Sequence, residues 1–199
     1  MRCVASSRYI GTCYGFAHGE PLGSVVQNGS DADALHALAV DCVRILGMTN
    51  GVFHFEAIQA DAGFVFMEVA ARAGGSYLPY MFRDVYGVDF VGNSLRLQLG
   101  LPMPPQQPRV ATHGGGLVVP EAFGCRVAAR RSMLGIVPEI YREILPELDH
   151  VFRGHGEYED VLGTFLFEGT SSAHVEAAIR TAIAEYAYTL VPAQEPELV

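Results

Sequence analysis

The chain has 199 residues, half of them hydrophobic, which is enough to bury a core in one or two domains. Its 22 acidic and 13 basic residues give a net charge of −9, which opposes non-specific binding to nucleic acid. The sequence has neither an 18-residue apolar run nor a basic segment followed by an apolar stretch, so we expect a cytoplasmic protein with no membrane partner.

The first elements are predicted from alternation and helical spacing. Residues 2–14 and 23–27 have the composition of strands, and the turn-prone residues 18–23 separate them. A helix is predicted to begin at Ser30 and to run through about Leu46, capped by Gly47, because apolar residues recur there at helical spacing.

A hairpin is predicted next, with two glutamates facing each other across it. Segments 52–59 and 64–70 are rich in Val, Ile and Phe and flank the turn residues 61–63. A turn centred on the middle residue of those three puts Glu56 directly opposite Glu68. Like charges in that arrangement destabilise a sheet, so a cation is expected between them.

Strand alternation divides the hairpin into an apolar face and a polar face. The apolar face, expected to be a core face, holds Phe53, Phe55, Ala57, Val65, Met67 and Val69, and the polar face holds His54, Glu56, Glu68 and Ala70. Carboxylate oxygens are the protein ligands that Mg²⁺ prefers. His54 is either a group that contacts a substrate or tunes a metal ligand, or an exposed strand histidine with a structural hydrogen bond.

An anion-binding segment is predicted directly after the hairpin. Arg72 and Gly74-Gly75 precede a helix expected over 76–86, with Ser76 near its N-cap. Glycines let the backbone approach an anion, helix N–H groups point toward it, and an arginine fork matches phosphate oxygens. Cation ligands and an anion cradle are therefore expected side by side.

The C-terminal part is predicted to be a smaller lobe of mixed structure. After a helix at 89–99 and the Pro-rich segment 101–108, His113-Gly-Gly-Gly116 is interpreted as a loop. The remaining predicted elements are a hairpin of 117–120 with 125–129, a strand at 161–167, a helix at 171–190 and a loose tail from Pro192.

Three stretches together resemble a known family. They are His54-Phe-Glu56, the run Met67-Glu-Val-Ala-Ala-Arg-Ala-Gly-Gly75, and Tyr86-Gly-Val-Asp89. They resemble the C-terminal half of ATP-grasp enzymes, most closely the carboxylate–amine ligases that include the L-amino acid ligases. The resemblance implies an α+β fold: the C-terminal half of an ATP-grasp fold, with an antiparallel sheet and helices, followed by a smaller α+β lobe.

The resemblance also implies roles for the site residues and for the cofactors ATP and Mg²⁺, with Mn²⁺ as an alternative cation. Glu56 and Glu68 would bind the metal, Arg72 would contact the transferred phosphoryl or acyl-phosphate group, and Gly74 and Gly75 would line the cofactor site. Many family members have Asn as a further metal ligand where this chain has Ala70, which leaves the number of metal ions open.

The domain organisation follows from the same resemblance. Residues 1–100 correspond to the C-terminal lobe of an ATP-grasp domain, residues 101–108 to a linker and residues 109–199 to a C-terminal α+β subdomain. All 13 basic residues are arginine, so the phosphate-binding lysines of the family are absent from the chain. We therefore interpret it as a fragment that lacks the N-terminal nucleotide-binding lobe, supplied in cis or in trans, and expect the isolated chain to be inactive.

The expected function is ATP- and Mg²⁺-dependent joining of a small-molecule carboxylate to an amine through an acyl phosphate. Two alternatives remain open. One is a non-catalytic ATP-grasp remnant or partner module, and the other is a metal-dependent hydrolase that uses the same carboxylates. The identity of the acid and the amine and the oligomeric state do not follow from the sequence.

Overall fold

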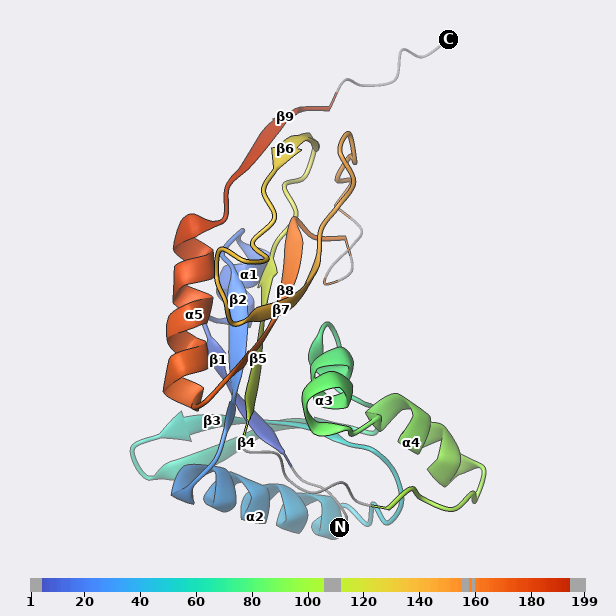
Figure 1. The fold of residues 1–199 in the computed structure, drawn as a ribbon. Coiled ribbons are helices and arrows are strands. Elements are labelled where there is room, and N and C mark those ends of the chain that lie inside the picture. The colour runs from blue at the N-terminus through green and yellow to red at the C-terminus, as the bar shows by residue number, and fades with distance from the viewer. Residues whose placement is uncertain (1–4, 106–111, 155–157, 159, 194–199) are drawn as a thin grey trace. The chain divides into compact units, whose positions relative to one another are not determined.

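The computed structural model describes residues 5–105, 112–154, 158 and 160–193. It contains α-helices and antiparallel strands, as expected for the α+β class (Figure 1). The chain forms two compact units, one of Met1–Arg8 with Val26–Thr112 and the other of Tyr9–Val25 with His113–Val199. The predicted division at residues 100 and 109 stays a prediction. Residues 9–25 group with the second unit, because β2 pairs with β5.

Two strands carry the chain between the units, and each unit has its own elements. The connecting strands are β1 (Ser6–Ile10) and β2 (Leu22–Gln27). The first unit holds α2 (Ser30–Ile45), β3 (His54–Ala60), β4 (Gly63–Ala70), α3 (Leu78–Tyr86) and α4 (Phe90–Gln98). The second holds α1 (Cys13–Ala17), β5 (His113–Val119), β6 (Cys125–Arg130), β7 (Ile140–Ile144), β8 (Gly163–Gly169), α5 (Ser172–Glu185) and β9 (Tyr188–Pro192).

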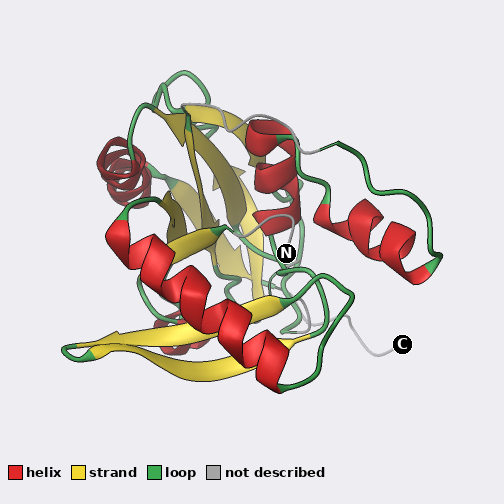
Figure 2. Cartoon of the chain, turned by 90° about the horizontal axis from the view of Figure 1, so that it is seen from below, coloured by secondary structure: helices red, strands yellow, loops and turns green. Residues whose placement is uncertain are grey.

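In the first unit the hairpin of β3 and β4 lies alongside α2 (Figure 2). A hydrogen bond from Gln59 Nε2 to Asp31 Oδ2, 3.2 Å long, joins β3 to the first turn of α2. The helix begins at Ser30 and its last residue is Ile45, close to the predicted limits. The hairpin is therefore supported on one side by a helix.

The second unit is built on the sheet β1-β2-β5-β8-β7, with α5 packed on β5 and β8 (Figure 1). Val175, Ile179 and Ala182 of α5 are buried in the core. A Cβ added at Gly115 of β5 would lie 2.6 Å from Val175 Cγ1, so this glycine is what lets the helix approach the strand. Among the helices within the described ranges, none has the length and apolar composition to cross a membrane.

One predicted strand and one predicted loop differ in the structure. The strand predicted at 2–14 ends at Ile10, since the Thr12 side chain accepts a hydrogen bond from Gly15 N and caps α1. Residues 2–4 lie outside the described ranges. The loop predicted at His113–Gly116 is wrong, because these residues form the start of β5.

The C-terminal predictions also need correction. The hairpin of 117–120 with 125–129 is wrong, because β5 is already paired on both edges, with β2 and β8, and β6 pairs with β9 instead. The helix predicted to continue to residue 190 ends at Glu185, and Tyr188–Pro192 forms β9. Tyr186 ends α5 with an extended backbone and donates a hydrogen bond from its hydroxyl to Leu162 O at 2.7 Å.

Candidate functional site

The register of the hairpin places Glu56 opposite Glu68, as predicted. The turn differs from the prediction. It has two residues, 61 and 62, instead of the predicted three, so that Ala60 faces Gly63. A regular ladder from this turn would put Glu56 opposite Met67. A β-bulge between Glu56 and Ala57 adds one residue on β4 and brings Glu68 into place. Bulges re-aim side chains in this way and are frequent next to active sites.

The bulge also changes the apolar face of the hairpin. Ala57 pairs with Phe66, and the rings of Phe55 and Phe66 lie 5.6 Å apart. The prediction that Val65 shares a core face with Phe55 is therefore wrong, because Val65 pairs with Ile58 and is 56% exposed. Met67 is the extra residue of the bulge and is 50% exposed. Phe66 takes the place opposite Ala57 that a regular ladder centred on Ala62 assigns to Met67, and Phe64 takes the place of Val65 opposite Gln59.

Three groups suited to metal binding meet on the other face of the hairpin. One ligand atom from each of His54, Glu56 and Glu68 lies within 4.8 Å of the others. His54 Nε2 donates a hydrogen bond to Glu56 Oε1 at 3.1 Å, and both side chains are less than one-fifth exposed, whereas Glu68 is exposed. In the part of the chain that the structure describes, this is the one group of three such residues. Its open side, at Glu68, leaves a path for a ligand.

The glycine-rich segment packs directly against this group. A Cβ added at Gly74 would lie 3.2 Å from His54 Nδ1 and 2.9 Å from Leu78 Cδ1. Any side chain at position 74 would thus press on the histidine that contacts Glu56. The fold thus brings the backbone of Gly74 next to His54, whereas the binding of a cation and of an anion there stays a prediction.

The helix after the glycines begins later than predicted. α3 begins at Leu78 and its N-cap is Tyr77, so Ser76 lies next to the N-cap as predicted, but no side chain caps the helix. Ser76 has a φ of 55°, a left-handed conformation that is strained for any residue with a Cβ. Its buried Oγ has no hydrogen-bond partner among the described residues.

Arg72 lies four residues after Glu68 on the segment that leads to the glycines. Its Nη1 donates a hydrogen bond to the neighbouring Ala73 O at 3.0 Å, and its side chain is exposed. The guanidinium therefore has access to solvent. Its assigned contact with a phosphoryl group stays a prediction, as do the roles of Glu56, Glu68, Gly74 and Gly75.

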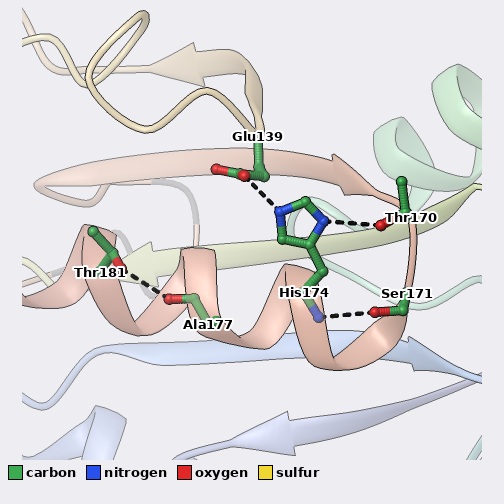
Figure 3. A network of polar contacts seen from close by, with 6 residues as sticks. All are labelled: Glu139, Thr170, Ser171, His174, Ala177 and Thr181. Atoms are coloured by element: carbon green, nitrogen blue, oxygen red, sulfur yellow. Dashed lines mark hydrogen bonds and ion pairs between the residues drawn. The ribbon is translucent and has the colours of Figure 1, made fainter.

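The structure shows two further groupings that sequence patterns did not reveal. In the second unit a cavity of about 450 Å³ is lined by Phe16, Phe123 and Tyr158 among others, with the rings of Phe16 and Tyr158 stacked at 4.7 Å. His174 bridges Glu139 Oε1 at 2.7 Å and Thr170 Oγ1 at 3.1 Å (Figure 3). Both groupings join residues from distant segments, so no local motif signals them.

The His174 network has a structural role in the fold. His174 N donates to Ser171 Oγ at 3.1 Å, which caps α5 (Figure 3). Glu139 precedes β7, so the imidazole joins the start of α5 to the chain before the edge strand. In this network the histidine pairs with one carboxylate, whereas His54 on the hairpin lies near two.

Comparison with known proteins gives partial sequence matches. No protein-family model matches the chain. Carnosine synthase 1 of Gallus gallus is 32% identical over 124 residues, which are 61% of this chain and 13% of that protein. Dapdiamide A synthase of Enterobacter agglomerans is 36% identical over 61 residues, 31% of this chain and 14% of that protein. The chain thus spans a small part of the curated relatives that it matches.

Solved structures share the fold over most of the chain. The L-amino acid ligase from Bacillus licheniformis has a TM-score of 0.65 at 17% identity, covering 84% of this chain and 43% of that one. N5-carboxyaminoimidazole ribonucleotide synthetase from Thermotoga maritima has a TM-score of 0.59 at 14% identity, covering 85% and 47%. The chain therefore shares the fold of these ATP-grasp carboxylate–amine ligases over most of its length, and its sequence is similar in part to two synthases.

Proposed function

We propose that this chain supplies the metal- and phosphate-binding surface of an ATP- and Mg²⁺-dependent carboxylate–amine ligase. The observation that carries the proposal is the pairing of Glu56 with Glu68 on a bulged hairpin, directly beside the backbone of Gly74. Two opposed carboxylates cost stability in an unliganded sheet, and a bound cation offsets that cost. The sequence matches to two synthases support the same function.

The donor set fits a hard divalent cation. Glu56 and Glu68 would supply oxygen ligands, and the exposure of Glu68 leaves room for water and phosphate oxygens beside them. Mg²⁺ held there would neutralise charge on the phosphate oxygens during phosphoryl transfer. Glu56, fixed by the hydrogen bond from His54, and Glu68, projecting from the opposite strand, would orient that cation.

The anion side of the proposed site is Arg72 with the backbone of Gly74 and Gly75. An exposed guanidinium presents a fork of N–H donors to two phosphate oxygens. Glycine at 75 meets nothing within 4 Å where a Cβ would stand, so a ligand can approach the backbone there. These groups would stabilise the charge that spreads over the transferred phosphoryl group.

The proposed reaction has two steps. A carboxylate oxygen of the first substrate attacks the γ-phosphorus of ATP, and ADP leaves with the electrons of the broken P–O bond. The nitrogen of an amine then attacks the acyl carbon, inorganic phosphate leaves, and the nitrogen loses a proton as the amide forms. The adenine pocket and further phosphate-binding cations would come from an N-terminal lobe in cis or in trans.

Isotope transfer tests this proposal in a complete ligase that contains this chain. With a carboxylate substrate labelled with ¹⁸O, each turnover should move one ¹⁸O atom into inorganic phosphate, and ADP release should require both the acid and the amine. Phosphate whose new oxygen comes from water, with ADP release independent of both substrates, would instead indicate a metal-dependent hydrolase and contradict the proposal.

A further inference from the structure

The hairpin offers a nitrogen ligand beside its two carboxylates. His54 pairs with Ala70 and Glu56 pairs with Glu68, two positions further along the same face. Because residues two apart on a strand share a face, these four positions form one patch. Ala70 has only a methyl group, so no polar side chain stands opposite the imidazole on this face.

The distances within this patch match those of a coordination sphere. In an octahedron with bonds of about 2.1 Å, neighbouring ligand atoms are about 3.0 Å apart and opposite ones about 4.2 Å. His54 Nε2 and Glu56 Oε1 are 3.1 Å apart, and the three ligand atoms of the group lie within 4.8 Å of one another. A small movement of the exposed Glu68 closes the remaining difference.

The ring of His54 is held in one orientation. Gly74 lies against its Nδ1 side, while Nε2 points to Glu56. Nε2 is therefore the nitrogen available to a cation between the glutamates, with the neutral imidazole carrying its hydrogen on Nδ1. Without a cation the same nitrogen donates its hydrogen to Glu56.

From this geometry we infer that His54 is a third protein ligand of the metal and makes the site selective for first-row transition cations such as Mn²⁺ over Mg²⁺. The inference rests on the proposed function, since it concerns the cation held by Glu56 and Glu68. Imidazole nitrogen raises the affinity for transition metals, whereas Mg²⁺ favours oxygen ligands. A site with one nitrogen and two carboxylates therefore favours the transition cation.

Pulsed electron paramagnetic resonance of Mn²⁺ bound to the chain tests the inference directly. A ¹⁴N nucleus bound to Mn²⁺ modulates the spin echo, and we expect this modulation in the wild-type chain and its loss in His54→Gln. The substitution should also lower Mn²⁺ affinity roughly tenfold while changing Mg²⁺ affinity, measured by competition, much less.

Two variants serve as controls for position and for folding. His174→Gln removes a histidine that pairs with a single carboxylate, and it should leave both the ¹⁴N modulation and the affinity unchanged. His54→Ala combined with Ala70→Asn places an amide oxygen on the opposite strand of the same face. That double variant should recover Mn²⁺ affinity relative to His54→Ala, without ¹⁴N modulation.

The outcomes separate this inference from the proposed function. Mn²⁺ that binds through the glutamates and shows no ¹⁴N modulation overturns the role of His54 and leaves the proposed function intact. Mn²⁺ binding that is unchanged by Glu56→Gln together with Glu68→Gln overturns both. Equal losses of Mn²⁺ and Mg²⁺ affinity in His54→Gln would show that His54 orients Glu56 and does not bind the metal, which would contradict the inference.

Discussion

At the scale of single residues, the two glutamates and Arg72 are expected to act while charge moves. In a complete ligase containing this chain, Glu68→Gln should lower kcat by about 10²–10³-fold, because one preorganised electrostatic contact is lost. Arg72→Lys should also lower kcat, since an ammonium group does not reproduce a two-pronged contact with phosphate oxygens.

Steady-state kinetics with Mg²⁺ and ATP measure both effects. Glu185→Gln, which removes an exposed carboxylate at the end of α5, is the matched control and should leave kcat unchanged. Wild-type turnover in both Glu68→Gln and Arg72→Lys would require the ligase assignment of this site to be abandoned.

Tyr186 gives a prediction about stability at high pH. Burial raises the pKa of its hydroxyl to about 12 against the opposing effect of Arg130, and the hydroxyl donates to Leu162 O. The unfolded chain loses this proton near pH 10, so the stability that it contributes is full below pH 10 and is lost as the pH rises to about 12. The free energy of unfolding should fall by up to about 1.4 kcal/mol per pH unit in that window from this group alone.

Denaturant unfolding of the wild type and Tyr186→Phe at several pH values isolates this contribution. The variant should be less stable at neutral pH, because Leu162 O loses its hydrogen bond, and the difference between the two proteins should shrink between pH 10 and 12. A constant difference across that range would contradict the raised pKa.

At the scale of elements, the close approach of α5 to β5 depends on Gly115. Gly115→Ala should destabilise the protein by about 1–3 kcal/mol, because the new Cβ would meet Val175 Cγ1 at 2.6 Å and Ser24 O at 2.9 Å. The matched control is Gly75→Ala, because a Cβ added at Gly75 would have no other atom within 4 Å. Chemical denaturation measures both variants, and equal stability of the two would show that α5 does not pack on β5 as described.

Local elements were more predictable than pairings between distant ones. The hairpin follows from two short strands and a turn, so the sequence predicted that Glu56 faces Glu68. The bulge that achieves this pairing was not predictable, because alternation assumes a regular ladder and the shorter turn would otherwise bring Met67 opposite Glu56. Sequence reasoning therefore placed Val65 on the wrong face.

The C-terminal pairings show the same limit. The helix at the end of the chain was predicted to continue to residue 190, yet Tyr188–Pro192 forms β9 and pairs with β6, about sixty residues away in sequence. Long-range pairing outweighs local propensity there. The contact of Gly74 with His54 was equally hidden, since only the fold brings position 74 against position 54.

At the scale of the whole molecule, the chain spans 43% of the L-amino acid ligase whose fold it shares. It contains no lysine, and phosphoryl transfer requires several cationic groups around the nucleotide. We therefore expect little or no ADP release by the isolated chain in a coupled assay with ATP, Mg²⁺ and amino acids. Robust amino-acid-dependent ADP release would show that the chain carries a complete site.

The most direct test of the central claim is calorimetric titration of the isolated chain with ATP, with Mg²⁺ and with a chelator in its place. If Glu56 and Glu68 hold the cation that bridges to phosphate, the wild-type chain should bind ATP weakly with Mg²⁺ and lose this binding with the chelator. Glu56→Gln combined with Glu68→Gln should show no Mg²⁺-dependent difference. ATP binding that is equal with and without Mg²⁺, or that persists with Mg²⁺ in the double variant, would contradict the account.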